Sequence, residues 1–199
     1  MGNGDMSTFA FTVIVDDAQG RAAELAQVNG LLVTSHSGSR ASVEFAVDSE
    51  VPLNAALDAC AGLSSASYTP LRFDLDLVSL SDIAERVGVS RETARLWSEA
   101  KRREGFPAHF TTVGASRIWA WADVCDWLEA EGLQRDPLYT EAPLPVDVVR
   151  VVNGMLARRR QSEQEGWRPA LSPSAPPIQV QAQRPARSTS LWAPIPVMP

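Results

Sequence analysis

The sequence predicts an α+β protein made of two small folded regions and a tail. Alternating hydrophobic and polar residues in the first 78 positions are typical of half-buried strands. Residues 79–132 contain two short helical patterns separated by a glycine and are rich in arginine. Residues 161–199 consist largely of proline, serine, glutamine and arginine, a composition too poor in hydrophobic residues to form a core. We therefore expect that tail to be disordered.

Residues 1–78 alternate strand and helix patterns. Phe9, Phe11, Val13 and Val15 fall on one face of the first predicted strand. The remaining patterns predict a helix, two strands joined by a Gly/Ser turn, a second helix and a last strand, over 17–27, 30–35, 40–47, 52–63 and 71–77. The order β-α-β-β-α-β is that of a ferredoxin-like sheet covered by two helices. This acidic region is our candidate for dimerisation or for binding a protein partner.

Two helices with a tight turn are predicted at the start of the second region. Ser79 followed by Asp82 is a capping pair, and Gly88 ends the helix that they begin. Ser90 caps the next helix, predicted over 90–104, because Gly105 is a natural stop. The small or hydrophobic residues of this segment are expected where the two helices cross: Ala84, Val89, Ala94 and Trp97.

A hairpin and a third helix complete this region. Strand-forming residues around a Gly-containing turn predict the hairpin over 108–120. Hydrophobic spacing predicts the third helix over 121–131. Residues 133–160 are expected to be a linker containing an amphipathic helix, although its β-branched run and Gly154 are poor helix formers.

The charge distribution is uneven along the chain. The whole chain has a net charge of −6, and residues 1–80 contain ten acidic and three basic side chains. Residues 86–117 contain seven basic side chains against three glutamates. A local excess of positive charge attracts a polyanion even when the whole protein is acidic. The sequence therefore predicts a nucleic-acid interface within residues 86–117.

The segment from Ser79 to Leu128 resembles the winged helix-turn-helix modules of the MerR-like and excisionase-like (AlpA-like) families. The resemblance rests on "LSDIAERVGVSRETARLW", on "GFP", on the hairpin and on "WAWADVCDWL". It implies that the second helix lies in the major groove of double-stranded DNA and that the hairpin is a wing. The residues that would then contact bases or phosphates are Ser90, Arg91, Thr93, Arg95, Lys101, Arg102, Arg103 and Arg117.

These observations favour a sequence-specific DNA-binding protein, a transcriptional regulator or excisionase-like factor, acting as a homodimer. The alternative is an antitoxin-like or adaptor protein that binds a protein partner through residues 1–78. Glu92 and Glu99 favour that alternative, because they place negative charge on the expected DNA face.

Other classes of protein are not indicated. We expect no enzyme activity, because Ser35 to Ser37 lack a positioned acid and oxyanion donors. Cys60 and Cys125 form no CxxC pair, and with only two histidines in the chain we expect no metal and no cofactor. No hydrophobic run approaches the roughly 20 residues that cross a bilayer, and no secretion signal is recognisable. We expect a cytoplasmic protein without a membrane partner.

Overall fold

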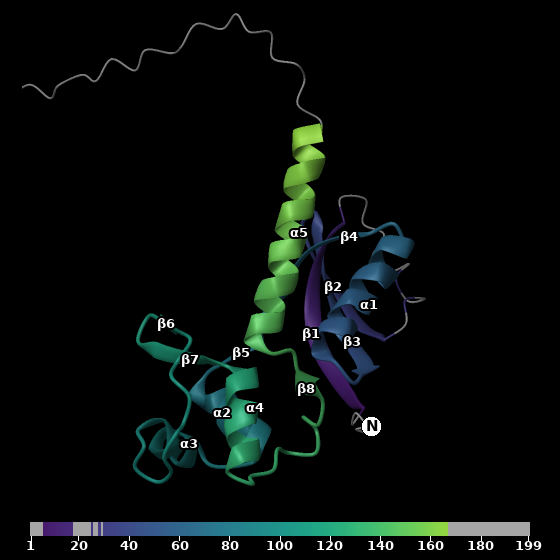
Figure 1. Cartoon of the computed structure of the whole chain (residues 1–199). Coiled ribbons are helices and arrows are strands. Elements are labelled where there is room, and N and C mark those ends of the chain that lie inside the picture. The colour runs from purple at the N-terminus through teal and green to yellow at the C-terminus, as the bar shows by residue number, and fades with distance from the viewer. Residues whose placement is uncertain (1–5, 18–24, 26–27, 29, 167–199) are drawn as a thin grey trace, which may run out of the picture. The chain divides into compact units, whose positions relative to one another are not determined.

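The computed structural model describes residues 6–17, 25, 28 and 30–166 (Figure 1). This part of the chain is a mixed α+β structure with two sheets and five helices. The α+β class predicted from the sequence is confirmed. The helix predicted over 17–27 lies almost wholly outside the described residues, as does the tail from Trp167 onward.

Four antiparallel strands form the main part of the first sheet: β1 (Ser7–Asp16), β2 (Leu31–Ser37), β3 (Arg40–Ser49) and β4 (Thr69–Asp74). Their order is β2-β3-β1-β4. The residues of β1 pair with those of β3 along the whole strand, from Ser7 with Ser49 to Asp16 with Arg40. Because β1 and β2 are both antiparallel to β3, they are parallel to each other, with β3 between them.

The last predicted strand, over 71–77, is divided between two sheets, and its prediction as one strand was wrong. β4 ends at Asp74, and β5 (Leu77–Val78) pairs with β7 of the second sheet. The backbone carbonyl of Asp76, between the two strands, accepts a hydrogen bond of 2.8 Å from the N–H of Trp121. The alternation of hydrophobic residues continues through this break, so the sequence pattern does not reveal it.

Two helices contribute to the hydrophobic core of the first sheet. Helix α1 (Pro52–Ser65) contributes Ala55, Ala56, Ala59 and Leu63. Helix α5 (Val146–Gly166) contributes Val149, Val152 and Leu156 to the same core. Just before α5, the short strand β8 (Ala142–Pro143) pairs in parallel with Phe9 and Ala10 of β1.

The end of the described chain therefore belongs to the first sheet. The expected linker over 133–160 does contain a helix, but its buried side is part of the first core rather than a separate element. Asn153 fixes it there by accepting a hydrogen bond from the N–H of Phe73 (2.7 Å) and donating one to its carbonyl (2.9 Å). The helix also continues through residues 161–166, which were expected to be disordered.

The second region contains α2 (Leu80–Val87), α3 (Arg91–Ser98), the hairpin β6–β7 (Thr111–Val113 and Ser116–Ala120) and α4 (Trp121–Ala130). Its sheet has the order β5-β7-β6. The predicted hairpin and third helix are confirmed. The buried residues of this region form a second core: Val78, Ile83, Ala84, Ala94, Trp97, Trp119, Trp121, Val124, Trp127 and Leu128.

None of the described helices combines the length and the hydrophobicity required to cross a membrane. No group of three or more potential metal ligands lies together among the described residues.

Candidate nucleic-acid interface

Local hydrogen bonds fix the start and the end of helix α2. The side chain of Asp82 accepts a hydrogen bond from the N–H of Ser79 (2.8 Å), and the hydroxyl of Ser79 accepts one from the N–H of Asp82 (3.4 Å). This is the capping box predicted from the sequence. Gly88 ends the helix with a φ of 70°, a left-handed conformation that favours glycine. The chain can therefore turn within two residues and begin α3.

The inner side of α3 carries a small residue, Ala94, and a large one, Trp97, about one turn later. Ala94 is completely buried, and Trp97 is 4% exposed. The rings of Trp97 and Trp127 lie 5.3 Å apart at an angle of 58°, a tilted aromatic contact. The indole N–H of Trp127 donates to the carbonyl of Glu104 at 3.0 Å. The predicted inward direction of Ala94 and Trp97 is confirmed, and α3 is held against α4.

Helix α3 is shorter than predicted. It ends at Ser98 rather than near residue 104, because Ala100 adopts a φ of 53° and the chain leaves the helical path. The N–H of Lys101 donates back to the carbonyl of Leu96 at 3.0 Å, which closes the helix end. The expected basic helical face is therefore interrupted. Three of the predicted DNA-binding residues lie in the loop after α3: Lys101, Arg102 and Arg103.

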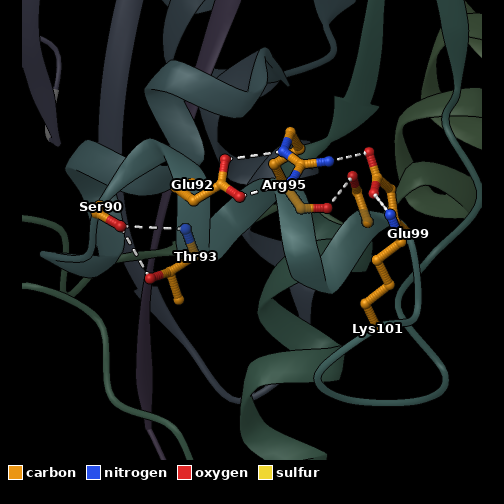
Figure 2. A network of polar contacts seen from close by, with 7 residues as sticks. Ser90, Glu92, Thr93, Arg95, Glu99 and Lys101 are labelled. Carbon is orange, nitrogen blue, oxygen red and sulfur yellow. Dashed lines mark hydrogen bonds and ion pairs between the residues drawn. The ribbon is translucent and has the colours of Figure 1, made fainter.

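Arg95 lies in a network of ion pairs that joins α3 to the residues just after it (Figure 2). Its Nε and Nη2 donate to the two carboxylate oxygens of Glu92 at 2.8 and 2.6 Å. Its Nη1 donates to Glu99 at 2.6 Å, and the ammonium of Lys101 lies 2.7 Å from the other oxygen of Glu99. Two cations and two anions are thus joined, and their formal charges cancel.

These contacts shift the pKa values of the ionisable groups in the directions that favour their charged forms. The hydrogen bond from Arg95 holds the pKa of Glu92 below its ordinary value. Lys101 and then Arg95 lower the pKa of Glu99 by hydrogen bonding. The two glutamates in turn raise the pKa of Arg95. The shifts favour the charged forms of Glu92, Glu99 and Arg95 near neutral pH.

The hydroxyl groups predicted to contact DNA are engaged with each other. Ser90 Oγ accepts a hydrogen bond from the N–H of Thr93 at 3.1 Å, which caps α3. The hydroxyl oxygens of Ser90 and Thr93 also lie 2.9 Å apart (Figure 2). Their first role in this structure is to begin the helix.

Two further arginines of the basic segment have partners within the second region or at its start. Arg103 donates to Glu131 at 2.6 Å, across 28 residues of sequence. Arg86 is paired with Asp76 at 2.5 Å, and its guanidinium lies 5.0 Å from the centre of the Trp121 ring. Both cations are neutralised locally by an acid.

The remaining arginines are exposed and have no ion pair among the described residues: Arg91, Arg102 and Arg117. Arg91 is the first residue of α3, and Arg102 follows that helix in the loop. Arg117 lies in β7, with its guanidinium 5.7 Å from the centre of the Trp119 ring. These three residues, which we call the free arginines, come from helix α3, the loop that follows it and strand β7 of the hairpin.

The hairpin that carries Arg117 is firmly attached at its base and open at its tip. The indole N–H of Trp119 donates to the carbonyl of Pro107 at 3.1 Å, and Trp119 is 2% exposed. Val113, next to the turn, is 65% exposed. Gly114 makes that turn with a φ of 59°. The base of the hairpin is thus packed and hydrogen-bonded, while its turn is exposed to solvent.

The structure separates the predicted site residues into those with partners and those without an ion pair among the described residues. Ser90, Thr93 and Arg95 make contacts at α3, and Lys101 and Arg103 are paired with acids. The free arginines form the other group. Residues overlooked in the site prediction are the acidic partners, of which Glu92 and Glu99 lie three and four residues from Arg95, a spacing that favours ion pairs on a helix. Glu131 gives no comparable signal in the sequence.

No protein-family model, curated protein or solved structure matches the chain.

Proposed function

We propose that the chain is a sequence-specific double-stranded DNA-binding protein, a transcriptional regulator, that reads DNA with α3 and its wing. The observation that carries the proposal is the set of free arginines on α3, the loop after it and strand β7 of the second region. Arginines in such positions meet phosphates and guanine edges, since the guanidinium is always charged and forms paired hydrogen bonds.

The arrangement of elements supports a finer description of both regions. Two crossed helices, a third helix and the sheet β5-β7-β6 are the parts of a winged helix-turn-helix. In the first sheet, the parallel strands β1 and β2 are separated by β3, as in a ferredoxin-like split βαβ unit. On this proposal α3 enters the major groove with its N-terminal residues toward the bases, and Arg117 of the wing contacts phosphate.

We further propose that two copies associate through the outer edge of β2. Strand β2 pairs with β3 on one side, and no described strand occupies its other side. Its sequence LLVTSHS contains neither a charged residue nor a proline, the usual means of blocking a sheet edge. At the opposite edge, β4 contains Pro70, and Asn153 occupies both backbone groups of Phe73. Two antiparallel β2 edges are complementary under a two-fold axis.

The dimer is tested by placing a charge on this edge. Ser35→Lys sets two like charges near each other when β2 pairs with its copy, which destabilises strand pairing. Ser39→Lys adds the same charge in the turn before β3. Light scattering after gel filtration is expected to give twice the chain mass for the wild type and for Ser39→Lys, and a lower mass for Ser35→Lys. A wild-type monomer would contradict the proposal.

DNA binding is tested by fluorescence anisotropy on a pool of genomic fragments and on random duplex, at two salt concentrations. We expect selective retention of some fragments by the wild type and its loss in Arg91→Ala. Arg158→Ala removes an equal charge from α5 and is expected to bind as the wild type does. Equal binding by the wild type and Arg91→Ala, or no binding by either, would contradict the proposal.

A second candidate is an antitoxin-like or adaptor protein whose partner is another protein. The neutralisation of Arg95, Lys101 and Arg103 by neighbouring acids favours it, because it removes positive charge from the expected DNA face. A stoichiometric partner that remains bound to Arg91→Ala, together with no DNA retention by the wild type, would support this candidate against the first.

A further inference from the structure

Glu92 is an exposed carboxylate on the second residue of α3, and its orientation is fixed. Its side chain is 64% exposed, yet both of its oxygens accept hydrogen bonds from one guanidinium, that of Arg95 (Figure 2). Such a two-point contact sets the plane of the carboxylate as well as its position. An exposed glutamate without this contact would sample many rotamers.

Arg95 is itself held from its other side. Its Nη1 donates to Glu99 at 2.6 Å, and Glu99 is paired with Lys101 at 2.7 Å. The two cations also balance the two carboxylates, so that Glu92 meets the phosphates of a duplex as part of a neutral group. The repulsion that a lone glutamate would suffer at a DNA surface is thereby offset.

The carboxylate retains the capacity to accept further hydrogen bonds. Each of its oxygens has two lone-pair directions, of which Arg95 uses one. In the major groove, cytosine presents only a donor, its N4 amino group, whereas guanine presents N7 and O6 acceptors. Thymine presents an acceptor and a methyl group, and adenine places its N7 acceptor beside its amino donor. A fixed carboxylate is therefore complementary to cytosine.

We infer that Glu92 is a specificity-determining residue that accepts a hydrogen bond from cytosine N4, and that Arg95 is its positioning residue. The inference rests on the proposed function. It changes the role of Arg95 from a residue that contacts bases or phosphates to one that orients an acid. The neighbouring Arg91, which has no ion pair among the described residues, remains the donor for an adjacent guanine.

The test is selection of bound sites from a random duplex library, followed by anisotropy on the selected duplex and its single-base variants. The wild type is expected to require cytosine at one position, with a discrimination of roughly 5- to 150-fold, the range for one good base contact. Glu92→Gln keeps the size of the side chain but carries an amide, which pairs with adenine N6 and N7. The preferred base at that position is expected to change from cytosine to adenine.

The positioning role of Arg95 has a separate readout. Arg95→Ala is expected to retain cytosine as the preferred base with weaker discrimination, and Arg95→Lys to recover part of it. Far-ultraviolet circular dichroism checks that α3 is retained. Glu104→Gln removes an equal charge from an exposed glutamate without an ion pair among the described residues, and is expected to leave every base preference unchanged.

The possible outcomes are distinguishable. Selective binding with the same base preferences in the wild type and Glu92→Gln would overturn the assignment of Glu92 and leave the proposed function standing. An unchanged discrimination in Arg95→Ala would overturn the positioning role. Absence of selective binding by the wild type to any duplex would overturn the proposed function and this inference together.

Discussion

The ion pair between Arg103 and Glu131 allows a quantitative test of the proposed function, because it decides whether Arg103 is available to contact DNA. The two side chains are 36% and 32% exposed, and their nearest charged atoms lie 2.6 Å apart. A paired arginine releases few counterions when a phosphate approaches, because an anion already neutralises it. Glu131→Gln frees Arg103 without altering α3.

The expected change follows from counterion release. Each additional phosphate contact steepens the slope of log K against log salt by about 0.9. A fourfold rise in salt then weakens binding of one module by about 3.5-fold more than in the wild type, and binding of two modules by about 12-fold more. The affinity at low salt should be higher than that of the wild type.

The assay is anisotropy on one selected duplex over a salt series. Glu129→Gln is the matched control, since it removes an equal charge two residues before Glu131, at the end of α4, and its glutamate is exposed without an ion pair among the described residues. A slope that changes equally in the two variants would show a general charge effect and refute the reasoning. An unchanged slope in Glu131→Gln would show that Arg103 does not reach phosphate.

Three further predictions concern stability and reactivity. In urea unfolding, Gly88→Ala is expected to lower the free energy of unfolding by about 1 kcal/mol, because the φ of 70° at this position is unfavourable for alanine. Gly154→Ala, with nothing near the added methyl group, should raise it by up to about 1 kcal/mol. Asn153→Ala removes two hydrogen bonds between α5 and β4 and should cost about 2–3 kcal/mol in the same experiment; a loss under about 0.5 kcal/mol would contradict this role. Burial raises the pKa of Cys60 to about 11 and that of Cys125 to about 12, so both thiols should react slowly with iodoacetamide at pH 8 until urea is added, and rapid reaction of the folded chain would contradict their burial.

Local signals in the sequence predicted much of the second region. The pair Ser79 and Asp82, the turn at Gly88 and the cap at Ser90 each act within four residues, and each is present in the structure. The end of α3 was not predictable in this way, because the residues after Ser98 are good helix formers and nothing marks Ala100 as left-handed.

Features that depend on distant parts of the chain were missed. The pairing of β8 with β1, the contact of Asn153 with Phe73 and the ion pair of Arg103 with Glu131 join residues far apart in sequence. Of the candidate site, the basic segment was recognised from its composition. Its division into free and paired arginines was only partly predictable, because the spacing of Glu92, Arg95 and Glu99 signals the pairs of Arg95 and no pattern signals the partner of Arg103.

The order of elements along the chain has a consequence for how the protein can be divided. Because β8 and α5 complete the core of the first sheet, the segment containing α2, α3, the hairpin β6–β7 and α4 forms an insertion within that fold, tethered at both ends. A truncation at residue 132 would remove Val149, Val152 and Leu156 from the first core. A single proteolytic cut between β4 and β5 would leave the inserted module attached through α4 and β8. The first sheet therefore keeps its whole core only when the segments before and after the insertion are both present.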